Sequence, residues 1–193
     1  MYGATIFPHS IGVAATFNVT AAQEAGRVTA MESKRSGMEW VEGIGGGISQ
    51  QPLWPRMYQT FGEDPFLAAE MVKAKTRGLQ GVRDANGMTK EEDKVGAILS
   101  HYLGESFPLS GHDLSDSSLS SPSLSRFFLP PFQSAVSANV SAIMLSSSSI
   151  NSVPIHSSPH LLSSTLRNTL NFTGPCVCLH LLSLDLSLDL SLS

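Results

Sequence analysis

Apolar residues at helical spacing predict two helices in the first half of the chain. The first is expected over residues 21–36, with Thr20 as its capping residue. The second is expected over residues 65–79, because an aspartate followed by a proline is typical of a helix start. Between them, residues 43–51 are rich in glycine and are expected to form a loop.

Short apolar runs later in the chain predict buried strands, over residues 95–103, 140–145 and 176–182. Two more helices are expected, over residues 127–138 and 158–170, the former started or kinked by a pair of prolines. Polar or serine-rich loops are expected at residues 82–94 and 109–125. Strands that alternate with helices favour βα units and a parallel sheet, so the predicted class is α/β.

Composition changes sharply along the chain. Of the 30 serines, 25 lie after residue 100, and the charged residues after Arg126 are Arg167, Asp185 and Asp189. The 193 residues carry a formal net charge of −4. This charge excludes a strong electrostatic case for binding nucleic acid or an anionic membrane, so neither is an expected partner.

The sequence predicts neither a secretory signal nor a transmembrane helix. The first residues have neither a basic start nor a sustained apolar core, so no secretory signal is expected. No run of 18 or more apolar residues occurs, so no transmembrane helix is expected either. Localisation and oligomeric state stay open.

Several motifs invite a cofactor or metal site, and each lacks a required part. The glycine run at residues 43–47 has neither dinucleotide nor phosphate-loop spacing. His156 and His160 have helical spacing, but the further ligands of a zinc site are not evident. Cys176 and Cys178 should point to opposite faces of a strand and act as small buried apolar residues. No metal or cofactor is therefore expected.

A longer series of motifs carries a family resemblance. In chain order these include Phe7-Pro8-His9-Ser10-Ile11-Gly12, Pro52-Leu53-Trp54-Pro55-Arg56, Thr60-Phe61-Gly62-Glu63-Asp64-Pro65, His101-Tyr102-Leu103-Gly104, Phe128-Leu129-Pro130-Pro131-Phe132 and Asn151-Ser152-Val153-Pro154. In this order and spacing the chain resembles the N-terminal domain of glycoside hydrolase family three, the β-glucosidase and β-xylosidase group. The resemblance spans residues 7–177 and is most specific over residues 52–65.

The resemblance implies a fold and a chemistry. Family members have a (β/α)8 barrel of the TIM type, with a sugar pocket at the carboxyl ends of its strands. A complete barrel needs about 250 residues. We therefore expect a partial barrel, incomplete at both ends, over residues 1–178 and a low-complexity tail of leucine, serine and aspartate over residues 179–193. The implied substrate is a β-linked glucoside or xyloside, hydrolysed with retention by two carboxyl groups about 5–5.5 Å apart.

Two residues carry over as substrate-binding positions. Arg56 falls on the arginine of the family's Pro-x-Trp-x-Arg motif, which binds sugar hydroxyls; the alternative is a structural ion pair with Glu63 or Asp64. His101 falls on the histidine of a Lys-His pair that grips the sugar, while the lysine position holds Ser100. Trp54 is expected to belong to the core rather than to a sugar platform. His112-Asp113 is expected in a solvated loop.

The nucleophile position departs from the family pattern. The aspartate of the family motif Gly-Phe-x-Gly-x-Val-x-Ser-Asp falls on Leu179, and leucine cannot attack an anomeric carbon. No catalytic residue is therefore assigned. Three interpretations stay open: a glycoside hydrolase family member that is inactive as this chain, a non-catalytic carbohydrate-binding or interaction protein, and an unstable fragment of a gene model.

Overall fold

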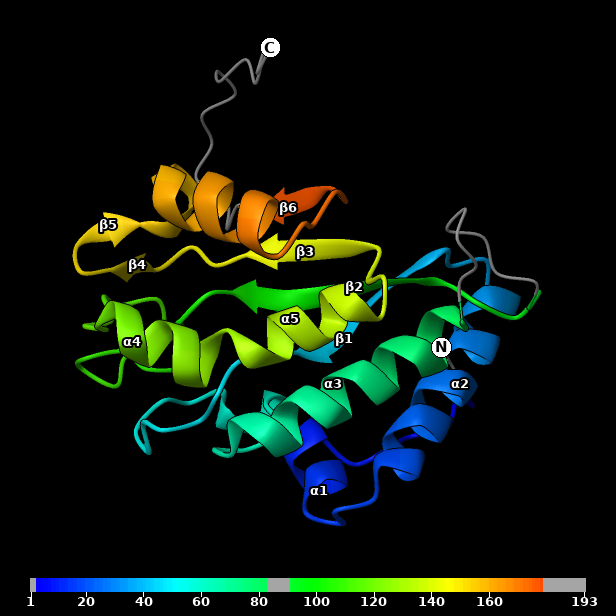
Figure 1. The fold of residues 1–193 in the computed structure, drawn as a ribbon. Helices are drawn as coiled ribbons and strands as arrows, with labels where there is room; N and C mark the ends of the chain where they lie inside the picture. The colour runs from blue at the N-terminus through cyan, green and yellow to red at the C-terminus, as the bar shows by residue number, and fades with distance from the viewer. Residues whose placement is uncertain (1–2, 83–90, 179–193) are drawn as a thin grey trace, which may run out of the picture.

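The computed structural model describes residues 3–82 and 91–178, which form an α/β fold around a parallel sheet. The sheet has the order β1-β2-β3-β6, formed by Trp40–Gly45, Gly96–Tyr102, Ala142–Leu145 and Cys176–Cys178. All three strand pairs are parallel. Four parallel strands in this order confirm the predicted class, and Figure 1 shows them side by side.

Helices connect the strands in sequence. The α-helices are α1 (Ser10–Ala14), α2 (Val19–Arg35), α3 (Pro65–Gln80), α4 (Ser121–Ser123) and α5 (Pro130–Ser137). The 3-10 helices are η1 (Met57–Gln59) and η3 (Ile155–Ser157), and the π-helices are η2 (Leu124–Phe128) and η4 (His160–Thr169). Helix α3 packs between α2 and α5 and also touches β1 and β2 (Figure 1). The order β1, α3, β2, α5, β3, η4, β6 repeats the βα unit, as the alternation of the sequence predicts.

The two long helices begin at side-chain caps. The Asp64 carboxylate accepts a hydrogen bond from the Leu67 amide at 2.7 Å, so α3 starts as predicted. Helix α2 starts earlier than predicted, because Asn18 rather than Thr20 is its capping residue. The Asn18 side chain accepts from the Ala21 amide at 3.1 Å, and both residue types are good caps, so sequence alone places this start only approximately.

Close contacts explain why two glycines line the helix pair α2 and α3. A Cβ atom at Gly78 would lie 2.1 Å from the Gln23 carbonyl oxygen. A Cβ atom at Gly26 would lie 2.7 Å from the Lys75 carbonyl oxygen. The backbones of the two helices therefore touch directly, which only glycine permits at these positions.

The glycine-rich segment predicted to be a loop starts inside a strand, which corrects the prediction for residues 43–51. Strand β1 continues through Gly45, and its glycines serve close packing rather than a turn. A Cβ atom at Gly45 would meet the Gln59 carbonyl oxygen at 2.1 Å, and one at Gly46 would meet the Phe132 ring at 2.8 Å. Because β1 is half exposed and rich in glycine, it lacks the apolar run that marks a strand in sequence.

The serine-rich segment over residues 109–125 is bonded to its surroundings. The Ser149 hydroxyl donates to the Asp116 carboxylate at 2.6 Å. The Asn151 amide donates to the Leu119 carbonyl at 2.8 Å. These bonds tie the segment to the small hairpin of β4 (Ser149–Ile150) and β5 (Val153–Pro154), which the sequence did not predict.

The later elements depart from the predicted boundaries in detail. The helix predicted over residues 127–138 is divided into η2 and α5, with its two prolines at the start of α5. The helix predicted over residues 158–170 is present as η4, which has π-type hydrogen bonding. Strand β6 confirms the start of the predicted strand at residue 176, and residues 179–182 lie outside the described residues.

Within residues 3–82 and 91–178, no helix is long and apolar enough to cross a membrane.

Candidate functional site

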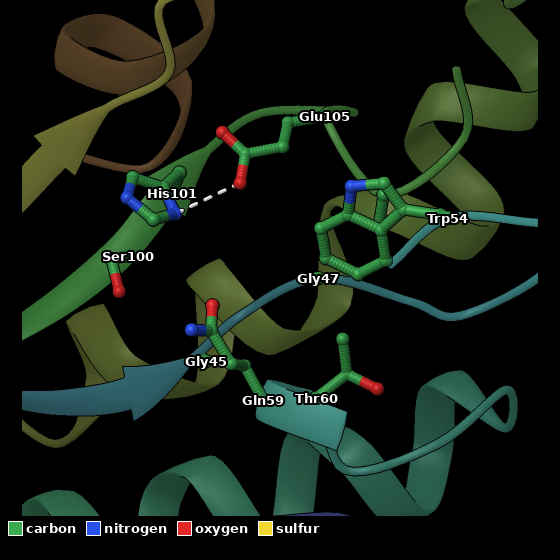
Figure 2. A pocket seen from close by; sticks show the side chains of 9 residues that line it. Gly45, Gly47, Trp54, Gln59, Thr60, Ser100, His101 and Glu105 are labelled. Carbon is green, nitrogen blue, oxygen red and sulfur yellow. Dashed lines mark ion pairs between the residues drawn. The ribbon is translucent and has the colours of Figure 1, made fainter. Parts of the chain in front are cut away.

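A pocket lies at the carboxyl ends of the parallel strands, where the family resemblance places a sugar. Its enclosed cavity volume is about 20 Å³, and the depression that opens from it to solvent totals about 270 Å³. Its lining comes from the ends of β1 and β2 and from the loops that follow them: Gly45, Gly47, Trp54, Gln59, Thr60, Ser100, His101, Glu105 and Ser106 (Figure 2). In parallel α/β folds this edge of the sheet is where ligands bind.

His101 lines this pocket, as its predicted role requires. It belongs to β2, and its side chain is only 14 % exposed. Its Nδ1 lies 3.0 Å from Oε1 of Glu105, the contact marked by the dashed line in Figure 2. Its Nε2 lies 3.9 Å from Oε1 of Glu42, on the neighbouring strand β1. The imidazole thus has a carboxylate on each side.

Arg56 adjoins the pocket through two residues that line it. Its Nη2 donates to Oε1 of Glu105 at 2.5 Å, and its guanidinium lies 5.5 Å from the centre of the Trp54 ring. Nη2 also donates to Oδ1 of Asp113 at 2.8 Å. The ion-pair partners expected from sequence, Glu63 and Asp64, are therefore wrong, because the chain turns back from β2 and brings more distant carboxylates to the guanidinium.

One buried donor of the arginine has no hydrogen-bond partner in the part of the chain that the structure describes. Among the described residues, Arg56 Nε is buried and has no hydrogen-bond partner. A buried donor without a partner costs free energy, so such groups often mark a place where a ligand or a water binds. Arg56 Nε is thus a buried donor to which no described residue supplies an acceptor.

Glu105 connects the two predicted substrate-binding residues. Its side chain is 5 % exposed, and Oε1 contacts both Arg56 and His101. Its other oxygen, Oε2, accepts a hydrogen bond from the Ser146 hydroxyl at 2.7 Å. Ser146 follows β3, so the carboxylate joins the ends of two neighbouring strands.

Glu105 was not among the site residues predicted from the sequence, although the sequence holds one signal for it. It is the only glutamate after Glu92, in a segment that is poor in charge. It also follows His101 by four residues. A lone carboxylate in such a segment is a candidate functional residue, but only the fold shows which residues it contacts.

Electrostatics tie the arginine to its second carboxylate. Burial opposes the charge of Arg56, yet the hydrogen bonds and charges of Asp113 and Glu105 outweigh it and raise the pKa of Arg56 above its ordinary value. Burial acts to raise the pKa of Asp113, but hydrogen bonds from Arg56 and Trp54 lower that pKa below its ordinary value. Asp113 is an exposed loop residue, as expected, and it is also bonded to Arg56 and Trp54.

Trp54 is buried, as predicted, and one ring edge faces the pocket. Its Nε1 donates to Asp113 at 3.0 Å, which satisfies the indole N–H away from the pocket. The bond fixes the ring that packs against Arg56. Trp54 therefore serves both the core and the wall of the site.

Other sequence candidates lie elsewhere. Cys178 is exposed rather than buried, because β6 ends the order of the described sheet, and Cys176 is partly buried. His156 and His160 are exposed, and within the described ranges no group of His, Cys, Asp and Glu has metal-binding geometry. Leu179, the predicted nucleophile position, and the tail over residues 179–193 lie outside the described residues.

Comparison with known proteins decides the family. The model of the glycosyl hydrolase family 3 N-terminal domain matches residues 1–187. The chain belongs to this family. A lysosomal β-glucosidase of Dictyostelium discoideum is 39 % identical over 178 residues, which cover 92 % of this chain and 22 % of that protein. A β-D-xylosidase of Arabidopsis thaliana is 30 % identical, over 89 % of this chain and 23 % of that protein.

Solved structures of family 3 relatives have the same fold. A β-glucosidase from intestinal bacteria, 34 % identical, superposes with a TM-score of 0.87 over 91 % of this chain and 23 % of that one. An exo-1,3/1,4-β-glucanase from a Pseudoalteromonas species, 29 % identical, gives the same score over 92 % and 22 %. The family 3 chain is therefore part of a TIM-type barrel, and it spans about a fifth of the length of these relatives.

Proposed function

We propose that this chain holds the sugar-binding part of a glycoside hydrolase and binds the glucose or xylose unit of a β-linked glycoside. The observation that carries the proposal is the convergence of Arg56 and His101, 45 residues apart, on one buried carboxylate beside the pocket. Relatives named as β-glucosidases and β-xylosidases support the class of sugar.

The chemistry of the site suits a sugar hydroxyl. A guanidinium offers several donors in one plane that hydroxyl oxygens can accept from, and the Arg56 side chain is 21 % exposed. A ring nitrogen of His101 supplies a second polar contact in the pocket wall. The edge of the buried Trp54 ring supplies an apolar part of the pocket wall.

We propose further that the chain alone does not hydrolyse the glycosidic bond. Retaining hydrolysis requires two carboxyl groups about 5–5.5 Å apart. Glu105 is the one carboxylate among the described pocket-lining residues, and its contacts with Arg56, His101 and Ser146 occupy both of its oxygens. The family's nucleophile position holds Leu179, which directly follows the last residue of β6.

Urea unfolding with and without glucose tests sugar binding. A ligand that binds only the native state stabilises it, by about 2.7 kcal/mol at a concentration one hundred times its dissociation constant. We expect glucose to raise the unfolding midpoint of the wild type and of Arg126→Gln, an exposed arginine away from the pocket. We expect the Arg56→Gln variant to unfold cooperatively with no shift.

The outcomes separate the three interpretations. A midpoint that glucose leaves unchanged in the wild type would refute sugar binding, and a broad, non-cooperative transition would identify an unstable fragment. Hydrolysis of an aryl β-glucoside that Arg56→Gln abolishes would refute the claim of no turnover.

A further inference from the structure

We propose that Glu105 is the positioning residue of the site: it fixes the imidazole of His101 and the guanidinium of Arg56 in their sugar-binding orientations. This inference rests on the proposed sugar binding. It assigns Glu105 a role that works through its two neighbours rather than through contact with a reacting atom.

The burial of Glu105 shows that its partners are essential. A carboxylate with 5 % of its surface exposed is unstable unless cations and donors replace its hydration. Arg56, at 2.5 Å, supplies the charge, and the Ser146 hydroxyl, at 2.7 Å, supplies a second donor. Because each of the two carboxylate oxygens has its own partner, the carboxylate cannot rotate freely.

The fixed carboxylate sets the state of His101. An ionised carboxyl group can only accept, so a proton on the nearby Nδ1, 3.0 Å from Oε1, is favoured over a lone pair there. In the neutral ring this leaves Nε2 as the acceptor. Nε2 lies 3.9 Å from Glu42, beyond hydrogen-bond distance, so it keeps its capacity for a sugar hydroxyl.

The same carboxylate sets the direction of the guanidinium. Glu105 and Asp113 both bind Nη2 of Arg56, on one corner of the planar group. With Nη2 held, the Trp54 ring, whose centre lies 5.5 Å from Cζ of Arg56, limits rotation of the guanidinium. The remaining donors of the guanidinium, whose side chain is 21 % exposed, then keep one direction, as preorganised binding groups do.

The test uses the full 193-residue chain, labelled with ¹⁵N, and three variants. Glu105→Leu removes the acceptor at similar size, Glu105→Gln keeps an acceptor oxygen without charge, and Asp116→Asn is the matched control. Asp116 is another carboxylate that binds serine side chains, and it lies outside the network of Arg56 and His101. Long-range ¹H–¹⁵N spectra of the imidazole report which ring nitrogen carries the proton, and glucose titration reports affinity.

We expect Glu105→Leu to shift the His101 proton away from Nδ1 and to weaken glucose binding at least tenfold. Glu105→Gln should keep the Nδ1 proton and weaken binding only several-fold, which is rescue by the conservative variant. Asp116→Asn should change neither readout. If Glu105→Leu does not fold, the difference between Glu105→Gln and wild type decides the case.

Two results would overturn the proposal: an unchanged imidazole spectrum in the folded Glu105→Leu variant, or equal effects of the Leu and Gln variants on affinity. If the Leu variant is unfolded, an affinity of Glu105→Gln equal to that of wild type would also overturn it. A wild-type chain with no affinity for glucose would instead refute the proposed function, and the imidazole spectra would still show whether Glu105 fixes His101.

Discussion

Replacement of Gln80 by leucine tests how the fold holds β2 and β3 in register at their amino ends, the ends opposite the pocket. Gln80 ends α3 and is fully buried. Its Nε2 donates to the Asn139 carbonyl at 2.6 Å. Its Oε1 accepts from the Ala97 amide at 3.3 Å and from the Ser141 amide at 3.0 Å.

The magnitude follows from these bonds. A leucine side chain fills similar space but offers no donor or acceptor, so the buried Ala97 amide and the partly buried Asn139 carbonyl and Ser141 amide lose this partner. A buried polar group that loses its partner costs about 1–3 kcal/mol. Because one of the three groups is fully buried, we expect Gln80→Leu to lower the free energy of unfolding by about 1–3 kcal/mol, a substantial share of the ~5–15 kcal/mol typical of a domain.

Urea unfolding followed by tryptophan fluorescence and far-ultraviolet circular dichroism measures this loss. Gln133→Leu, an exposed glutamine on α5, is the matched control and should change the midpoint little. A Gln80→Leu midpoint equal to that of the control would refute the reasoning. It would mean that Ala97, Asn139 and Ser141 are satisfied without the amide.

Four further predictions follow from single residues. Ser152 has φ of +65°, so Ser152→Gly should stabilise the chain by about 0.5–1 kcal/mol in urea unfolding, and a loss of stability would contradict this. Burial lowers the pKa of Lys75 from 10.5 to about 8. Between these two values the unfolded chain binds more protons than the folded chain, so the free energy of unfolding rises with pH. Lys75→Met should abolish that rise, which unfolding midpoints measured over this pH range would show. The lowered pKa of Asp113 contributes stability that is present above the unfolded pKa and lost as pH falls through the folded one; Asp113→Asn should remove this part of the acid transition followed by circular dichroism, and an unchanged transition would count against it. Leu179→Asp should not restore hydrolysis of an aryl β-glucoside, since one carboxylate is not the required pair; measurable turnover would contradict this.

Features with a local cause were predictable from the sequence. The start of α3 depends on Asp64 and the proline after it, and its end on Gly81, which has φ of +68°. The buried strands β2 and β3 depend on apolar runs that mark them without reference to any partner. These signals act over a few residues, so one sequence suffices to find them.

The resemblance to a family also predicted Arg56 and His101 as site residues, but it did not give their partners. The sequence offered Glu63 and Asp64 for Arg56 because they are close in the chain. The fold offers Glu105 and Asp113, which are 49 and 57 residues away. Strand β1 was missed for the same reason: Gly45, its last residue, and the following Gly46 are explained by Gln59 and Phe132, not by their neighbours in sequence.

The sequence by itself therefore determined the α/β alternation and the cap of α3, and it predicted Arg56 and His101 as binding residues, because each depends on local pattern or on motif. Only the tertiary structure decided that Glu105 joins these residues and that Ser146 holds its second oxygen. The physical reason is that parallel strands bring their carboxyl ends to one edge, so residues far apart in the chain share one buried charge network.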